Sequence, residues 1–157
     1  MNRISNALAI FALLLTAPAA TAASELGNAG DLPATAQDLS GETVAQITGD
    51  FPDASDVDLY KLCLSGGGTF SASTVGGSDV DTQLYLFDAN GLGVYGNDDA
   101  DGVFQSMLPA GHALTPAAAG TYYLAVSPYN LEPRNDSGLI FLDVPGVLAP
   151  LGPGASE

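Results

Sequence analysis

The chain has 157 residues, with 18 acidic and 3 basic side chains, and its formal net charge is -15. A surface this acidic repels phosphate backbones and anionic lipid headgroups, so nucleic acid and anionic membrane surfaces are excluded as partners. The single cysteine excludes an intramolecular disulfide, so the stability of the fold must come from packing or from metal.

The first segment of the chain has the pattern of a secretory signal peptide. A positive charge stands at Arg3, residues 7–17 are apolar, and small residues follow at 20–23. An apolar run of this length is too short to span a bilayer comfortably. We therefore predict a signal peptide over residues 1–22, a mature start at Ala23 or Ser24, and a secreted product, extracellular or periplasmic, with no membrane span after leader removal. An uncleaved anchor is the alternative.

Removal of the leader leaves roughly 135 residues, the size of one domain. Residues 23–38 are rich in Gly, Ala, Asn, Asp and Pro, which predicts an irregular lead-in. Residues 145–157 consist mainly of Pro, Gly and Ala without periodicity, which predicts a flexible tail. The folded domain is therefore expected over residues 39–144.

Short runs with a period of two follow one another through this domain, separated by turn residues. The run at 82–87 carries apolar residues on both faces, which predicts a central strand, and Asn90-Gly91 after it predicts a tight reversal. No stretch after the leader has a helical stripe. We predict an all-β fold, an antiparallel β-sandwich of jelly-roll type with about seven to eight strands, with a closed barrel as the alternative. Strands are expected at 44–48, 57–64, 69–75, 82–87, 92–95, 103–108, 120–127 and 138–144.

The only cysteine, Cys63, lies within the expected strand at 57–64. A nucleophilic thiol needs a nearby base and an electropositive setting, and the neighbouring sequence offers neither. We therefore predict that Cys63 is buried as a small hydrophobic residue.

The order of the segments DVDLYKL, DTQLYLFDANG, NDD and AGTYYLAVSPYN resembles the bacterial pre-peptidase C-terminal domain, from about residue 30 to residue 144. This resemblance implies a β-sandwich that serves secreted peptidases as a non-catalytic accessory module. Some relatives, including the collagen-binding domains of clostridial collagenases, bind calcium and an extracellular ligand. The resemblance therefore implies calcium as a cofactor and an extracellular protein or polysaccharide as a partner. No peptidase segment precedes the domain in this sequence, so a free-standing secreted form is expected.

Two acidic clusters are candidate calcium sites. In the first, Asn97, Asp99 and Asp101 stand at alternate positions before a glycine, which is the opening of a calcium-binding loop, and Asp98 adds a further carboxylate. A helix-loop-helix calcium motif is excluded because Leu108 stands where its last acidic ligand would be. The alternative is a solvated acidic turn whose side chains cap backbone amides.

The second cluster joins the lead-in to the turn before the strand at 57–64. In calcium-binding relatives the acidic residues of these two segments are the ligands, so the resemblance implies a site here as well. The alternative is again an exposed charged turn. The residues of this candidate site are Glu25, Asn28, Asp31, Asp53, Asp56 and Asp58.

The sequence offers little for catalysis. His112 is the only histidine, and neither Ser106 nor Ser127 lies in a G-x-S-x-G motif. The absence of tryptophan removes the usual platform for a sugar ring. We therefore predict a secreted, non-catalytic binding or accessory module that calcium stabilises. The alternative is a small secreted hydrolase, a peptidase or a glycosidase, since paired carboxylates are brought together only in space.

Overall fold

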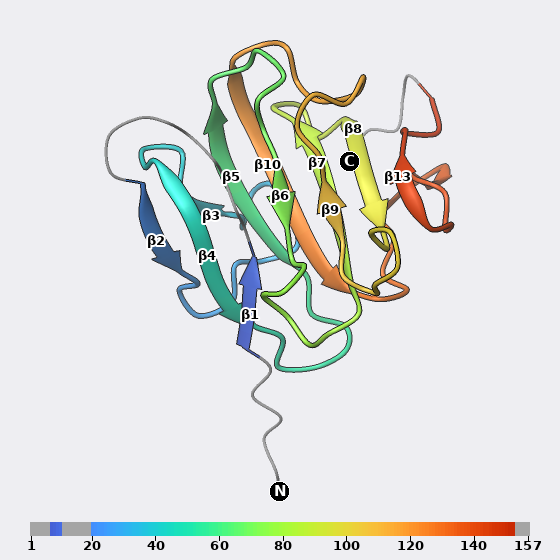
Figure 1. The fold of residues 1–157 in the computed structure, drawn as a ribbon, viewed down its shortest axis with the longest axis horizontal. Coiled ribbons are helices and arrows are strands. Elements are labelled where there is room, and N and C mark those ends of the chain that lie inside the picture. The colour runs from blue at the N-terminus through green and yellow to red at the C-terminus, as the bar shows by residue number, and fades with distance from the viewer. Residues whose placement is uncertain (1–6, 11–19, 153–157) are drawn as a thin grey trace, which may run out of the picture.

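The computed structural model describes residues 7–10 and 20–152 of the chain (Figure 1). Most of the predicted signal peptide, residues 1–6 and 11–19, and the end of the predicted tail, residues 153–157, lie outside the described residues. The described part consists of strands and turns, and no helix in it is long and apolar enough to cross a membrane.

The larger layer of the fold is a six-stranded sheet in which most neighbouring strands are antiparallel. The exception is the edge strand at residues 37–38, which pairs in parallel with the strand at residues 58–64. In spatial order the strands are β13 (Gly146–Leu148), β8 (Gly93–Asp98), β7 (Thr82–Asp88), β10 (Gly120–Pro128), β5 (Asp58–Leu64) and β3 (Gln37–Asp38).

The second layer consists of two smaller sheets that cover one face of the larger one (Figure 1). One has the order β1-β4-β2 and the other pairs β6 with β9. A further short pair, β11 with β12, follows β10. These strands are β1 (Ala7–Ile10), β2 (Thr21–Ser24), β4 (Val44–Asp50), β6 (Ala72–Ser73), β9 (Met107–Leu108), β11 (Arg134–Asn135) and β12 (Gly138–Leu139).

Strand β7 shows how the sequence pattern builds the two faces of the larger sheet. Leu84 and Leu86 are fully buried in the core between the two layers. Tyr85 and Phe87 point to the opposite face, where the ring of Phe141 lies 5.1 Å from the Tyr85 ring, centroid to centroid. The predicted central strand is confirmed, because β7 lies between β8 and β10 and is apolar on both sides. The fold is an all-β, largely antiparallel sandwich, as the sequence predicts.

The reversal after β7 also forms as expected. The side chain of Asp88 accepts hydrogen bonds from the backbone N–H groups of Asn90 and Leu92, and Gly91 has a φ of 80°. The return strand, however, continues through Gly96, where the sequence suggests a break. A Cβ atom at this position would lie 2.5 Å from Cδ1 of Tyr85, so glycine here makes room for the packed ring.

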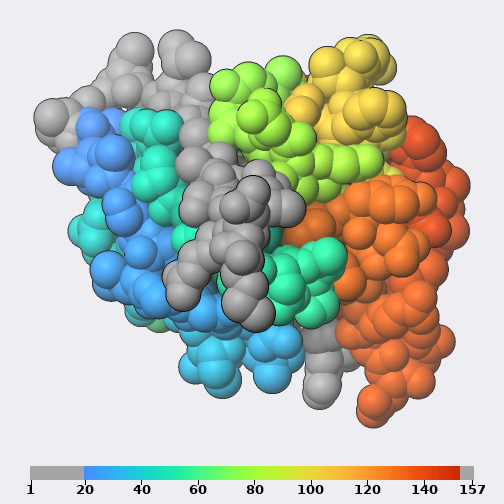
Figure 2. Space-filling view, turned by 90° about the horizontal axis from the view of Figure 1, so that it is seen from below, coloured from blue at the N-terminus to red at the C-terminus, as the bar shows by residue number. Residues whose placement is uncertain are grey.

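The C-terminal end of the domain also differs from the sequence prediction. Only β12 forms within the segment 138–144, and the residues after it turn back to place Ile140 and Phe141 against the outer face of β7. Residues 146–148, expected in the tail, form β13 and pair with β8. Viewed from below, the lead-in and the segment that follows β10 lie on opposite sides of the molecule (Figure 2).

The prediction for Cys63 is wrong, because the residue is exposed. Its neighbours Leu62 and Leu64 face the core between the layers, so the period of two on β5 directs Cys63 to the other face. The residues that cover that face pack against β7 and the first half of β5, and they leave the end of β5 open.

Candidate functional site

The lead-in lies beside the start of β5, and this contact brings together carboxylates that are far apart in the sequence. The Asn28 side-chain Nδ2 donates a hydrogen bond of 2.7 Å to Oδ1 of Asp56. The carboxylate of Glu25 accepts the backbone N–H groups of Ala29 and Asp50, each at 3.1 Å. Backbone pairing of β3 with β5 continues the contact. We call Glu25, Asp56 and Asp58 the lead-in cluster.

Asp58 is the most deeply buried member of the lead-in cluster. It has 0% of its surface exposed, and neither carboxylate oxygen has a hydrogen-bond partner among the described residues. Burial, followed by the negative charges of Glu25 and Asp56, raises the pKa of Asp58 to about 8. Burial also raises the pKa of Asp56, whose Oδ2 is buried without a partner. The cluster therefore lacks the counter-charge that its carboxylates need when ionised.

The hydroxyl of Tyr60 belongs to the same site, although Tyr60 is not among the ligands predicted from the sequence. The hydroxyl is buried, and its pKa is raised by burial and then by the charge of Asp58. Residues 58 and 60 share a face of β5 because side chains alternate along a strand. That spacing is the signal that could have included Tyr60.

Two of the predicted ligands of this site lie apart from its buried centre. The carboxylate of Asp53 accepts both the backbone N–H and the hydroxyl of Ser55, and these hydrogen bonds lower its pKa. Asp53 is exposed and closes its own turn. Asp31 is also exposed and lines a groove on the outer face of the sheet.

The first predicted cluster is reorganised in the structure. Asp98 and Asp99 come together with Asp81, which is not among the predicted ligands, and one ligand atom of each lies within 4.8 Å of the others. Asn97 is buried and structural, because its Oδ1 accepts the Met107 N–H at 2.6 Å. Asp101 is exposed. We call Asp81, Asp98 and Asp99 the loop cluster.

The electrostatics of the loop cluster follow from its burial. The pKa of Asp98 is raised to about 6. Burial is the main cause, a hydrogen bond from the Gln83 amide offsets part of it, and the charges of Asp99 and Asp81 add to the rise. The pKa of Asp81 is raised by burial and then by Asp99. The register of β7 and β8 explains why Asp81 lies near Asp98, since Asp98 is paired with Gln83, two residues after Asp81. Recognising Asp81 from sequence would have required that register.

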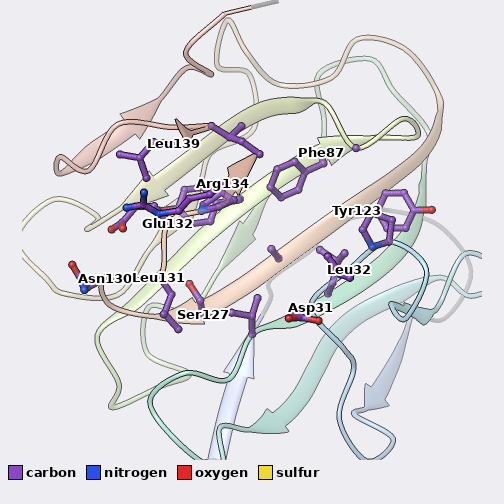
Figure 3. A pocket seen from close by; sticks show the side chains of 18 of the residues that line it. Asp31, Leu32, Phe87, Tyr123, Ser127, Asn130, Leu131, Glu132, Arg134 and Leu139 are labelled. Carbon is purple, nitrogen blue, oxygen red and sulfur yellow. The ribbon is translucent and has the colours of Figure 1, made fainter. Parts of the chain in front are cut away.

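A groove of about 440 Å³ runs over the outer face of β5, β10 and β7. Figure 3 shows Leu32 and Tyr123 on one side of it and Glu132 and Arg134 on the other. Aromatic side chains of the sheet, including Phe87, form part of its wall. Its volume is within the range of small-ligand sites, which are commonly about 300–1,000 Å³.

Of the residues considered for catalysis, Ser106 and His112 have structural partners, whereas the buried hydroxyl of Ser127 has none among the described residues. The hydroxyl of Ser106 is buried and lies 2.6 Å from the backbone oxygen of Thr82, to which it donates. His112 is exposed, and its Nδ1 accepts the backbone N–H of Leu114 at 3.2 Å. Ser106 and His112 therefore do not form a pair of nucleophile and general base.

Residues 56–128 match the family model described as the bacterial pre-peptidase C-terminal domain. No curated protein and no solved structure matches the chain. The matched stretch begins at Asp56 in the lead-in cluster, contains the whole loop cluster, and ends with β10. It thus spans the four long strands of the larger sheet, in the order and with the acidic segments on which the resemblance rests. Residues 56–128 of this chain are therefore similar to the bacterial pre-peptidase C-terminal domain.

Proposed function

We propose that the protein is a secreted, non-catalytic accessory module whose fold is stabilised by calcium at the lead-in cluster. Domains of this family are accessory domains that occur in secreted bacterial proteins. The observation that carries the calcium assignment is the full burial of Asp58, with both of its oxygens unpartnered among the described residues and with Asp56 beside it. A bound cation would supply the missing counter-charge.

The chemistry of the donors fits calcium. Carboxylate and amide oxygens are hard ligands, and calcium accepts six to eight of them in flexible geometry. Asp56 and Asp58 present oxygens without partners among the described residues, whereas Glu25 is oriented by two backbone N–H groups and retains further lone pairs. These three residues would hold the ion, and Asn28 would orient Asp56.

The test is the thermal midpoint of the purified protein at pH 8, with and without 1 mM calcium. Extracellular modules commonly bind calcium with a Kd of about 10⁻⁴ to 10⁻³ M, so one site adds about 0.4 to 1.4 kcal/mol, or a few degrees. Asp58→Asn should remove this contribution and leave the calcium-free protein at least as stable as the wild type, because it removes a buried charge.

Asp31→Asn is the matched control, since it removes one carboxylate from the same lead-in without touching the buried centre. It should keep the calcium response. A midpoint that rises no more with calcium than with sodium chloride of equal ionic strength would overturn the proposal. So would an Asp58→Asn protein whose calcium response equals that of the wild type.

The non-catalytic assignment is supported by the structural roles of Ser106 and the exposed position of His112. The alternative, a small hydrolase, is favoured by one observation: the carboxylates of Asp31, Glu132 and Asp143 line the groove. A screen of peptidase, esterase and glycosidase substrates separates the two. We expect no turnover, and turnover that is lost in His112→Ala or Glu132→Gln would establish the hydrolase.

The groove is also where we propose that an extracellular protein or polysaccharide is bound. It combines an apolar and aromatic wall with a few charged groups, the arrangement that holds ligands and orients them. The test is binding to extracellular matrix proteins or polysaccharides. Tyr123→Ala should weaken this binding. Cys63→Ser is the control and should leave it unchanged, because Cys63 is exposed at the end of β5 and does not line the groove.

A further inference from the structure

We propose that the loop cluster is a second, separate calcium site, formed by Asp81, Asp98 and Asp99. One oxygen from each carboxylate lies within 4.8 Å of the other two. Oxygens bound to one calcium ion at about 2.3–2.6 Å are at most about 5 Å apart, so the three are already close enough to share an ion. The ligand set differs from the one that spacing along the loop predicts.

The fold holds these three side chains from two different segments. Asp98 is the last residue of β8, and Asp81 immediately precedes β7. The antiparallel register of β7 and β8 brings them to the same end of the sheet. Asp99 follows with a φ of 62°, which turns the chain after the strand and brings its carboxylate to the same point as that of Asp98.

A second observation points to a ligand at this place. Asp98 is only 3% exposed, and its Oδ1 is buried without a hydrogen-bond partner among the described residues. Oδ1 of Asp81 and Oδ1 of Asp99 are likewise buried without partners. An acidic turn that is simply solvated would present these oxygens to water. Here each of the three carboxylates instead has one oxygen shielded from solvent and unused by the protein.

No positive side chain compensates this cluster. The basic residues within 20–152 are Lys61, which is ion-paired with Asp38, and Arg134 on β11. Two or three carboxylates at this separation repel one another, and a divalent ion converts the repulsion into attraction. The donors are all carboxylate oxygens, which excludes a preference for soft metals. Calcium is favoured over magnesium, because magnesium needs shorter bonds in strict octahedral geometry and retains its waters.

The loop cluster is independent of the lead-in cluster. Strands β10 and β7 lie between β5 and β8 in the sheet, so the two clusters are separated by roughly 14 Å at a strand spacing of about 4.8 Å. An ion here would join the entry to β7 with the exit from β8. It would thereby fasten the loop that leads from β8 to β9.

The experiment is a calorimetric titration of calcium chloride into the metal-free protein at pH 8. We expect two ions bound per chain in the wild type and one in Asp58→Asn. In the Asp58→Asn background, Asp98→Asn and Asp81→Asn should each weaken the remaining site by about tenfold or more, because each removes a charged ligand. Magnesium should bind at least about tenfold more weakly than calcium.

Asp101→Asn is the matched control, because Asp101 is an exposed acid of the same loop and lies outside the cluster. Its affinity should stay within about twofold of the parent. The proposal is overturned if the Asp58→Asn protein binds no calcium, or if Asp101→Asn weakens binding as much as Asp81→Asn does. If Asp98→Asn impairs folding, Asp81→Asn decides the question, since Asp81 is only half-buried. A wild type with one ion that Asp81→Asn removes and Asp58→Asn retains would support this site and refute the lead-in site.

Discussion

The lead-in cluster and the loop cluster are built from the same kind of side chain, but they keep their charges in different environments. Asp58 is fully buried, and its pKa is raised to about 8. The pKa of Asp98 is raised only to about 6, because Asp98 is less deeply enclosed than Asp58 and the Gln83 amide hydrogen bond offsets part of the effect of burial. At neutral pH and without metal, Asp58 therefore holds a proton, whereas Asp98 is mainly ionised.

This difference has a consequence for metal binding. Calcium binds carboxylates, so an ion at the lead-in cluster must displace a proton from Asp58 at pH 7, and an ion at the loop cluster need not. The affinity of the lead-in cluster should then fall as pH decreases below about 8, and the affinity of the loop cluster should fall only below about 6. Burial thus separates two acidic sites that look alike in the sequence.

The largest expected effect is a loss of stability with rising pH in the calcium-free protein. Both folded pKa values lie above the ordinary value of 3.8, so the folded state binds more protons than the unfolded state. The stability that these protons give is complete below about pH 4 and is lost as pH rises through about 6 and then about 8. One pKa unit corresponds to about 1.4 kcal/mol, and water that reaches the loops reduces the total, so we expect a loss of about 2 kcal/mol between pH 5 and pH 8.

The measurement is the thermal midpoint in a chelator at pH 5, 6.5 and 8. Calcium should cancel most of the loss at pH 8, and Asp58→Asn should flatten the dependence between pH 6.5 and 8. A calcium-free midpoint that is constant or rises from pH 5 to pH 8 would contradict the buried, uncompensated state of both clusters.

The second effect concerns Asn97, which lies next to the loop cluster but braces the fold. Its side chain accepts the Met107 N–H and donates to the backbone oxygen of Asp99. Asn97→Ala should destabilise the protein by about 1–2 kcal/mol, because it leaves a buried donor and acceptor unpaired. The loss should be similar in calcium and in chelator when measured by urea unfolding. If the destabilisation appears only in calcium, Asn97 is a ligand, as its spacing in the sequence suggests.

Sequence patterns are sufficient for the parts of this fold that depend on alternation. The two apolar faces of β7, the aromatic strand β10 and the Asn90-Gly91 reversal are all local, and each is found where the pattern predicts it. The same rule misplaces Cys63, because alternation says which residues share a face but not whether that face is covered. Coverage depends on Ile140 and Phe141, which come from a segment about 80 residues away in the chain and pack there through tertiary contacts.

The candidate sites show the same limit. Spacing along the loop groups Asn97, Asp99 and Asp101, but side chains alternate only as long as the strand continues, and β8 ends at Asp98. The positive φ of Asp99 then turns the chain, and Asp101 reaches solvent. Asp81 enters the cluster through strand pairing, which no local spacing reveals. The lead-in cluster, by contrast, could be located by resemblance, although resemblance did not show that Asp58 is its buried centre.

The smallest expected effect separates a site-specific role of the two clusters from a general effect of the negative charge of the protein. Asp38 is an exposed carboxylate that already has a counter-charge, since Lys61 Nζ lies 2.7 Å from its Oδ2. Hydrogen bonds from Lys61 and Ser40 lower its pKa, so any stability that it gives is present above the ordinary pKa and is lost as pH falls through the lower folded value. Asp38→Asn retains an oxygen that can accept from Ser40 and loses only a screened ion pair, so the thermal midpoint should change by roughly a degree at pH 7, and by less in 1 M salt. Its calcium response should equal that of the wild type. If Asp38→Asn reduces the calcium response as much as Asp58→Asn does, calcium acts by screening the charge of the whole chain, and neither cluster is a site.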